Sequence, residues 1–375
     1  MCDSKSTGRV NAMRRTPTVA AMALRVDDVR VVSTVTGAGS TGHTDERFAL
    51  HATDLGIVWD DGDGGVLVAF GDSFGAGWGG SGAGPGHADW RANIVTRSTT
   101  ADPLRDGLDL TEAVTDAPGH AREVLHREGA GEFTIIPTTG IAVDLTDGGP
   151  VGHERRALEL PDGGPARQFL HYMSVARWFG PGRWRTNHGG IAVSDDGGET
   201  WVRSVGARWG NGPFGRRSFQ MAAFAHDPTT PGRVLIWGTR NGRFGPASLA
   251  RAPGLRLDDP SAWEYFTGSG WSRRRRDAAT VVRAPVAELS VGWHHGLRRW
   301  LMLHLDEARA AIVLRDAAAP EGPWSDGVEV IAGRDVPAPY GGYLHPWTLD
   351  GPEVGFTLSQ WGPYNVFLVR MTLAA

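Results

Sequence analysis

The chain has 375 residues, a formal net charge of −4 and a sequence pI near 6.4. A slight acidic excess disfavours a nucleic-acid partner, which usually needs a basic face, and no apolar run reaches the roughly 18 residues that span a bilayer. The 53 glycines, 23 prolines and 15 tryptophans indicate many short strands joined by tight turns. The single cysteine, Cys2, excludes an intrachain disulfide and leaves the redox compartment open.

The N-terminal segment, residues 1–26, is polar and irregular and is predicted to be a flexible tail. Arg14 and Arg15 precede a short apolar stretch, Val19–Leu24, that breaks off at Arg25. This stretch is too short for a typical secretory signal, so the sequence decides neither the compartment nor the oligomeric state.

The rest of the chain is a succession of β-rich runs separated by turn signals, without sustained helical periodicity. Only Leu104–Ala113 and Ala121–Arg127 could hold a turn or two of helix. With weaker candidates there are roughly twenty strands, which at four a blade make about five blades. We therefore predict a single all-β domain over residues 27–375, a five-bladed β-propeller; a two-domain β-sandwich is the alternative. The clearest runs are Val29–Val35, Gly56–Trp59, Val66–Phe70, Asn93–Arg97, Phe133–Val143, Phe169–Trp178, Gly190–Val193, Phe219–Ala225, Val234–Gly238, Val286–Trp293, Trp300–Leu305, Ala311–Arg315, Val354–Trp361 and Val366–Leu373.

The first predicted hairpin carries two aspartates at matching positions. Asp54 precedes one strand, Asp72 follows the next, and the turn between them is centred near Asp63. In a symmetric register the two carboxylates face each other, although a one-residue slip would spoil this pairing. Neighbouring carboxylates cannot both ionise freely, and an acid and base pair of this kind cleaves glycosidic bonds. The alternative is that both are strand-end residues that accept backbone hydrogen bonds.

A short motif further along the chain supports the architecture. Ser194–Trp201, with the sequence SDDGGETW, fits the Asp-box turn of sialidase-like propellers. In such a turn Asp196 accepts backbone N–H bonds, glycines take positive φ and Trp201 packs underneath. The motif is a folding device and indicates nothing about catalysis.

Several further pieces identify a family. The hairpin contributes TDLG and FGDSF, and the other pieces are WRAN (Trp90–Asn93), IPTTG (Ile136–Gly140), GPWS (Gly322–Ser325), YGGYLHP (Tyr340–Pro346) and LSQWGPYNVFL (Leu358–Leu368). In this order they resemble the DUF4185 family, which includes the endo-D-arabinanases of glycoside hydrolase family 183. The resemblance covers nearly all of the chain after about Val29.

The resemblance implies a five-bladed propeller that hydrolyses the α-linked D-arabinofuranose backbone of mycobacterial-type arabinogalactan and lipoarabinomannan, with inversion at the anomeric carbon. The two family aspartates map onto Asp54 and Asp72, and we favour Asp54 as the base and Asp72 as the acid. The loop Gly75–Gly86 closely follows Asp72 and is rich in glycine. Its side chains are too small to form a wall that closes one end of a cleft. We therefore predict internal cleavage of the polysaccharide.

Other polar and aromatic residues are candidates for substrate binding. Polar side chains could hold furanose hydroxyls, and tryptophans could stack on sugar faces. Each has a structural alternative, because most of the 15 tryptophans must belong to the core and a lone charge or imidazole in a strand is often a buried hydrogen-bonding group. Glu132 is a weaker candidate, and Arg273–Arg276 reads as a solvated loop. The predicted binding residues are Trp90, Arg91, Asn93, Gln220, Trp237, Glu288, His345 and Trp361.

Signals for other chemistry are missing. There is no nucleotide-binding loop, no HExxH motif and no paired CxxC motif, and His294-His295 lacks a companion at metal spacing. We predict no cofactor and no metal site, while a structural cation in the propeller channel stays open. The rival functions are a non-catalytic glycan-binding propeller and a hydrolase of another furanoside, such as L-arabinan or a fructan. A lectin has no use for two nearby aspartates, so the carboxylate pair separates these functions.

Overall fold

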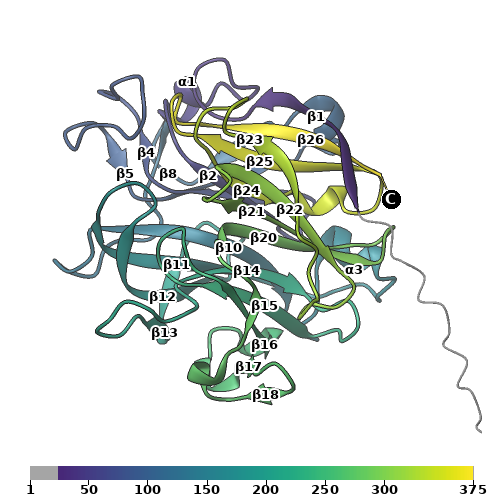
Figure 1. The fold of residues 1–375 in the computed structure, drawn as a ribbon. Coiled ribbons are helices and arrows are strands. Elements are labelled where there is room, and N and C mark those ends of the chain that lie inside the picture. Colours follow the sequence, from purple (N-terminus) through teal and green to yellow (C-terminus); the bar gives the residue numbers. More distant parts are fainter. Residues whose placement is uncertain (1–23, 375) are drawn as a thin grey trace, which may run out of the picture.

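The computed structural model describes residues 24–374, which fold into five antiparallel sheets arranged around a central channel (Figure 1). Each sheet is a blade that begins with its innermost strand. Blade 1 contains β2 (Leu55–Asp60), β3 (Val66–Phe70), β6 (Ile94–Ser98) and β7 (Glu112–Ala113); blade 2 contains β10 (Thr134–Asp144), β11 (Ala166–Trp178), β12 (Trp184–Ser194) and β13 (Val202–Gly210). Blade 3 contains β14 (Met221–His226), β15 (Arg233–Thr239), β16 (Ala247–Pro253), β17 (Glu264–Phe266), β18 (Trp271–Ser272) and β19 (Thr280–Val282); blade 4 contains β20 (Ala287–His294), β21 (Arg299–Asp306), β22 (Ala311–Ala317) and β23 (Val328–Ala332).

Blade 5 closes the ring with strands from both ends of the described chain. Its order is β24 (Pro339–Leu344), β25 (Glu353–Gln360), β26 (Asn365–Ala374) and then β1 (Arg25–Thr34), which pairs antiparallel with β26. The predicted five-bladed propeller is confirmed, and the two-domain β-sandwich is excluded. Most of the predicted tail lies outside the described residues, but its last residues, from Arg25, already belong to β1.

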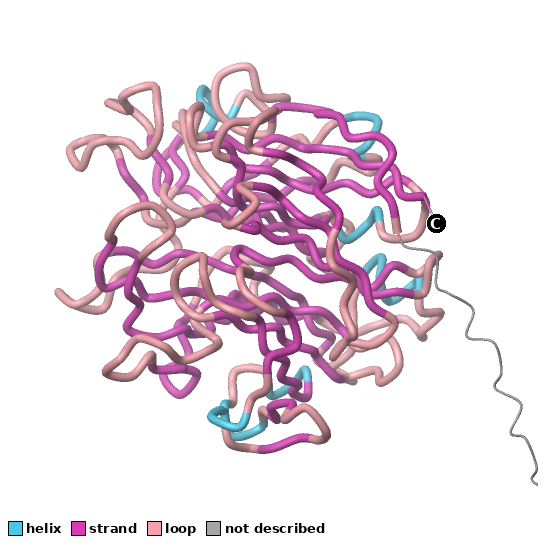
Figure 2. The backbone as a smooth tube through the Cα atoms, viewed as in Figure 1, coloured by secondary structure: helices cyan, strands magenta, loops and turns pink. Residues whose placement is uncertain are grey.

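Helices are short and few in the described part of the chain (Figure 2). One of them, α2, overlaps the start of the predicted segment Leu104–Ala113, whereas Ala121–Arg127 contains no helical turn. The helices are α1 (Thr44–Phe48), α2 (Pro103–Asp106) and α3 (Gly152–Ala157), with 3-10 turns η1 (Gly254–Arg256), η2 (Pro260–Ala262), η3 (Arg275–Asp277) and η4 (Pro346–Thr348). Two small hairpins add β4 (Ser73–Phe74) with β5 (Trp90–Arg91), and β8 (Thr115–Ala117) with β9 (His120–Ala121).

Apolar side chains between neighbouring blades form the core. On inner strand β10, Gly140 lies against the indole of Trp59, and a Cβ at this glycine would come within 2.4 Å of the ring. The inner strand therefore passes this close only because residue 140 has no side chain. Trp201 packs on the other side of the same region, 6.5 Å from the ring centre of Trp59 in an edge-on arrangement. It follows the predicted Asp-box, in which Asp196 accepts the Thr200 N–H at 2.9 Å.

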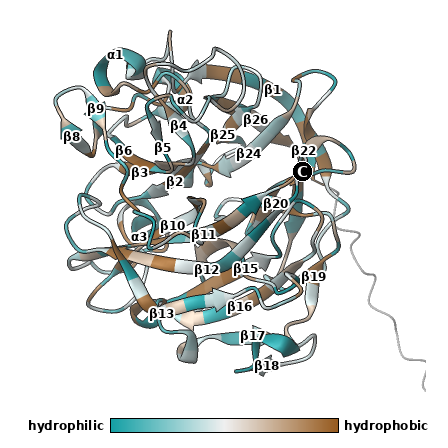
Figure 3. Cartoon of the chain, turned by 90° about the vertical axis from the view of Figure 1, so that its left-hand side faces the viewer, coloured by the Kyte–Doolittle hydropathy of each residue, from teal (hydrophilic) through white to brown (hydrophobic). Residues whose placement is uncertain are grey.

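The five inner strands β2, β10, β14, β20 and β24 all start at the same end of the channel, which we term the site face. It lies on the left in Figure 1, beside β4, β5 and β8, and faces the viewer in Figure 3. Four inner strands have a β-bulge near this end, at Leu55/Ile57, Pro137/Thr139, Ala287/Ser290 and Tyr340/Tyr343. Because a bulge re-aims the side chains beside it, these irregularities shape the opening of the channel.

Candidate active site

The register of the β2–β3 hairpin matches the prediction along most of its length. Pairs Ile57↔Ala69 and Asp60↔Val66 place the centre at residue 63, as expected. A bulge then shifts the pairing, so that Leu55 lies opposite Phe70. The prediction that the two aspartates face each other directly is wrong, because the N–H of Gly71, the residue before Asp72, donates to the Asp54 carbonyl at 3.2 Å.

Asp54 nevertheless points into the channel opening, where two tyrosines of blade 5 hold it. The hydroxyls of Tyr340 and Tyr364 donate to Asp54 Oδ2 at 3.2 and 3.1 Å. Its other oxygen, Oδ1, is buried and has no partner among the described residues. Burial raises the pKa of Asp54 well above its usual range, and the charges of Asp72 and Glu288 raise it further against the effect of the two hydroxyls.

Asp72 lies beside Asp54 at the same opening and has a different set of donors. The Trp90 Nε1–H and the Thr134 hydroxyl both donate to Asp72 Oδ1, at 2.9 and 3.1 Å. Burial raises its pKa to about 6, although the two donors favour the ionised form. Near neutral pH, Asp72 is therefore largely ionised, whereas burial and the neighbouring charges of Asp72 and Glu288 favour the protonated form of Asp54.

Glu288 of β20 is the third carboxylate at the opening. It lies in the bulge of its strand with a positive φ of 47° and accepts a hydrogen bond from the Gly341 N–H at 3.1 Å. Arg243 lies 2.8 Å from its Oε1 and places its guanidinium 5.2 Å from the ring centre of Tyr340. Glu288 thus has its own partners, and it acts on Asp54 through its charge and through the placement of Tyr340.

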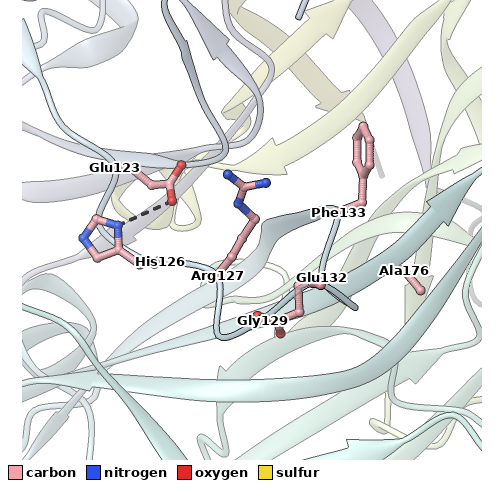
Figure 4. A pocket seen from close by; sticks show the side chains of 8 residues that line it. Glu123, His126, Arg127, Gly129, Glu132, Phe133 and Ala176 are labelled. Carbon is pink, nitrogen blue, oxygen red and sulfur yellow. Dashed lines mark ion pairs between the residues drawn. The ribbon is translucent and has the colours of Figure 1, made fainter.

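A pocket of about 590 Å³ lies next to Thr134, the residue that donates to Asp72, and is lined in part by the preceding Phe133 (Figure 4). Trp90 connects the pocket with the aspartate, since its indole lies under the guanidinium of Arg127 at 5.5 Å and 6.3 Å from the ring of Phe133. Arg127 and Phe133 project to the same side of their loop in Figure 4. The pocket is lined by Glu123, His126, Arg127, Gly129, Ala130, Glu132, Phe133 and Ala176.

Trp361 provides an aromatic surface on the other side of Asp54. It is 50% exposed, and its ring centre lies 6.5 Å from Tyr340 and 5.5 Å from Tyr364. The loop Gly75–Gly86 lies against it, because the Gly82 N–H bonds to the Gly362 carbonyl at 3.0 Å. An exposed ring beside a carboxylate is the arrangement on which a sugar face can stack.

Five predicted binding residues lie elsewhere. Asn93 is fully buried and uses its amide on the carbonyls of Leu125 and Ile135. Arg91 bonds to two carbonyls, Gln220 accepts from Thr186 and donates to a carbonyl, and Trp237 is a fully buried core residue. His345 follows β24 at the opposite end of the channel from Tyr340. These side chains are buried and bonded within the protein, and their contact with substrate stays a prediction. Trp90, Glu288 and Trp361 do lie at the opening.

The sequence reasoning did not single out four residues of the site: Tyr340, Tyr364, Thr134 and Arg243. The two tyrosines stood within the family pieces YGGYLHP and LSQWGPYNVFL, which were therefore an available signal. Glu132 forms an ion pair with Arg203 at 2.7 Å on the wall of the pocket. Within residues 24–374 no group of three or more His, Cys, Asp or Glu side chains could hold a metal ion. No helix of the same range is long and apolar enough to cross a membrane.

The fold and the site define the class of this protein: a five-bladed propeller with an aspartate pair at one opening of its channel. Residues 39–370 match the family model described as "Domain of unknown function (DUF4185)", and the chain belongs to this family. It is 27% identical over 359 residues to Notoamide biosynthesis cluster protein J of Aspergillus sp. (strain MF297-2), covering 90% of this chain and 87% of that protein. That name states no reaction.

Solved structures share the fold. A protein from Bacteroides ovatus that carries a provisional hydrolase name superposes with a TM-score of 0.57 at 12% identity, covering 88% of this chain and 87% of the other. The exo-β-1,3-galactanase of Phanerochaete chrysosporium superposes with a TM-score of 0.50 at 10% identity, covering 93% of this chain and 64% of the other. At such low identity the likeness establishes the architecture alone.

Proposed function

We propose that this protein is an inverting, endo-acting glycoside hydrolase that cleaves α-D-arabinofuranosyl linkages of mycobacterial-type arabinogalactan and lipoarabinomannan. The observation that carries the proposal is the aspartate pair: two neighbouring, half-buried aspartates with raised pKa values at one channel opening. Glycosidic bond cleavage needs one carboxyl that keeps its proton and one that accepts a proton. Membership of DUF4185, together with the TDLG and FGDSF pieces, supports the choice of D-arabinan.

The charges around the two carboxyls favour the assignment opposite to the one suggested by the sequence. Asp54, whose protonated form is favoured by burial and by the neighbouring charges of Asp72 and Glu288, acts as the general acid, and Asp72, with a pKa of about 6, acts as the general base. Asp72 takes a proton from a water molecule as the water oxygen attacks the anomeric carbon. The bond to the leaving sugar breaks at the same time, and Asp54 donates its proton to the leaving oxygen. Attack from the opposite face inverts the anomeric carbon.

The surroundings of the pair suit a long chain. Trp361 offers an exposed surface on the Asp54 side, and Trp90, Phe133 and the 590 Å³ pocket offer one on the Asp72 side. Binding surfaces on both sides of the carboxyls allow a polysaccharide to lie across them. This arrangement supports internal cleavage.

The test is incubation with purified arabinogalactan and lipoarabinomannan, with L-arabinan and a fructan in parallel, followed by chromatography of the released sugars. We expect a ladder of oligosaccharides from the D-arabinans, with NMR showing the anomer opposite to that of the substrate in the first product. Free arabinose appearing first would contradict endo action, and a retained anomer would contradict inversion. Binding without release of sugar from any substrate would identify a lectin-like propeller instead.

A further inference from the structure

Three loops of blades 2 and 3 form a continuous rim next to the candidate site. They are the loop between β11 and β12 with the strand ends beside it, residues 177–187, and the loops 211–217 and 240–244, and we call them together the arginine rim. Hydrogen bonds join each loop to its neighbour, so the rim is one surface. The bonds run from Asn241 Nδ2 to the Trp184 carbonyl at 2.7 Å, from the Arg243 N–H to the Gly182 carbonyl at 2.9 Å, and from the Asn211 N–H to the Asn187 carbonyl at 3.0 Å.

The rim carries a concentration of uncompensated positive charge. Its three loops contain no aspartate or glutamate, in a protein whose formal net charge is −4. Six of its arginines are exposed, and none of the six forms an ion pair with a carboxylate of the described chain. Elsewhere most arginines of the chain are paired. The six are Arg177, Arg183, Arg185, Arg216, Arg217 and Arg240.

Exposed aromatic rings lie between these arginines. Phe179 is 55% exposed and Phe244 is 47% exposed. The guanidinium of Arg177 lies 5.3 Å from the ring centre of Phe179, and that of Arg183 lies 4.6 Å from the ring centre of Phe244. Stacking holds the guanidinium plane and leaves its N–H edge available to a ligand, in the fork geometry that suits carboxylate and phosphate.

The rim borders the catalytic opening directly. Arg243, at its inner edge, contacts Glu288 and lies against Tyr340, whose hydroxyl donates to Asp54. At the other edge Asn187 Nδ2 donates to the Gly131 carbonyl in the loop that lines the pocket. A polysaccharide chain bound across the aspartates would therefore have its side groups within reach of the rim.

We propose that the arginine rim binds negatively charged groups on the polysaccharide that this site cleaves, so that the preferred substrate is a glycan bearing phosphate or carboxylate groups near the cleaved linkage. This inference rests on the proposed function. Phosphate and carboxylate both present a pair of anionic oxygen acceptors that the arginine fork binds, and the experiment separates them.

The test measures binding without turnover. The Asp54→Asn protein is titrated by calorimetry with a neutral arabinan oligosaccharide, with the same oligosaccharide bearing one terminal phosphate, and with its oxidised form bearing one carboxylate. We expect at least one charged form to bind about tenfold more tightly than the neutral form at low salt, with the difference shrinking at high salt. The form that gains identifies the substituent.

Matched variants assign the effect to the rim. The triple change Arg183→Gln, Arg216→Gln and Arg240→Gln is expected to remove the preference for the charged forms. The control removes three other exposed, unpaired arginines of the described chain, Arg25, Arg30 and Arg298, and should leave the preference intact. Equal loss in both triples would overturn the proposal, as would equal affinity of the neutral and charged forms.

A single-stranded DNA oligonucleotide is the last arm. If it binds the Asp54→Asn protein as tightly as the charged oligosaccharide and displaces it, the rim is a general polyanion surface and the proposal fails. The outcomes also separate this inference from the proposed reaction. Hydrolysis of neutral D-arabinan without a preference for charged forms would overturn the proposed role of the arginine rim and leave the proposed reaction intact. Tighter binding of charged oligosaccharides that depends on the arginine rim, without hydrolysis of any substrate by the natural protein, would overturn the proposed reaction and leave the role of the rim intact.

Discussion

Strand β2 has an aspartate at each end, and the two ends differ in how completely the carboxylate is bonded. At the far end, Asp60 accepts hydrogen bonds from the N–H groups of Gly62 and His153, both at 2.8 Å, and from Trp347 Nε1 at 2.6 Å. At the site face, Asp54 has two tyrosine hydroxyls on one oxygen and no partner on the other. Asp60 is therefore fully hydrogen-bonded within the protein, whereas Asp54 keeps one carboxyl oxygen without a partner among the described residues.

The surroundings of the two ends follow the same division. Side chains from α3 and η4 cover the far end, where burial raises the pKa of Glu154 to about 8 and lowers that of His345 to about 3. Both groups are therefore held neutral at physiological pH, and the cavity there measures only about 100 Å³. The site face has the 590 Å³ pocket and the exposed Trp361. The neutral Glu154 and His345 lie at one opening, and the aspartate pair beside an accessible pocket lies at the other.

The largest expected effect separates the aspartates of the two ends. Asp54→Asn and Asp72→Asn should each lower the rate of polysaccharide hydrolysis by about 10²–10⁴-fold, because each removes a proton donor or acceptor without changing shape. Asp60→Asn should keep its rate per folded molecule and lose about 1–3 kcal/mol of unfolding free energy, because an amide cannot accept at both positions. Kinetics and chemical denaturation of all three variants test this. A fast Asp54→Asn or Asp72→Asn enzyme would remove that residue from catalysis.

A second experiment distinguishes the roles of Asp54 and Asp72 at the site face. A substrate whose leaving group needs no proton, such as a nitrophenyl arabinofuranoside, bypasses the acid but still needs the base. We expect this substrate to recover about 10-fold or more of the lost rate in Asp54→Asn and to recover nothing in Asp72→Asn. Recovery only in Asp72→Asn would reverse the assignment and restore the one suggested by the sequence.

The stability of Asp72 variants should depend on pH. The folded-state pKa of about 6 exceeds the ordinary value of 3.8, so the folded protein prefers the protonated form of this carboxyl. The resulting stabilisation is complete below pH 3.8 and is lost as the pH rises through 6. Asp72→Asn should therefore be more stable than the natural protein at pH 8, by about 1–3 kcal/mol, and nearly equal at pH 4. Denaturation at both pH values provides the measurement, and a destabilised variant at pH 8 would contradict it.

The smallest expected effect concerns the charge beside Asp54. Glu288 raises the pKa of Asp54, so Glu288→Gln should lower that pKa and move the basic limb of the pH–rate profile to lower pH. Glu307, which lies 3.8 Å from the far side of the Arg243 guanidinium, is the matched control, and its change to Gln should leave the limb in place. A limb that moves equally in both variants would show that Arg243, and not Glu288, controls the acid.

The sequence predicted the propeller, the position of the hairpin turn and three of the eight binding residues at the opening. The pairing register of β2 and β3 could be predicted between residues 57 and 69, because the alternation of side chains between the two faces of the sheet and the length of the turn determine it. The bulge at Leu55 could not, since it depends on Ser359, whose hydroxyl accepts the Leu55 N–H at 2.7 Å from another blade. For the same reason the buried Trp237 and the exposed Trp361 looked alike in the sequence, and His345 gave no sign of which end of the channel it occupies.

The candidate centre lies over the junction of the first and last blades. Asp54 opens blade 1, and its two tyrosines belong to blade 5, with Tyr364 standing 310 residues further along the chain. Asp54 is synthesised early, and it gains its two tyrosine hydroxyl donors only when blade 5 has been synthesised and closes the ring. A growing or truncated chain that stops before Tyr364 thus carries both aspartates without the arrangement that holds them. The proposed hydrolysis therefore requires blade 5 to be complete.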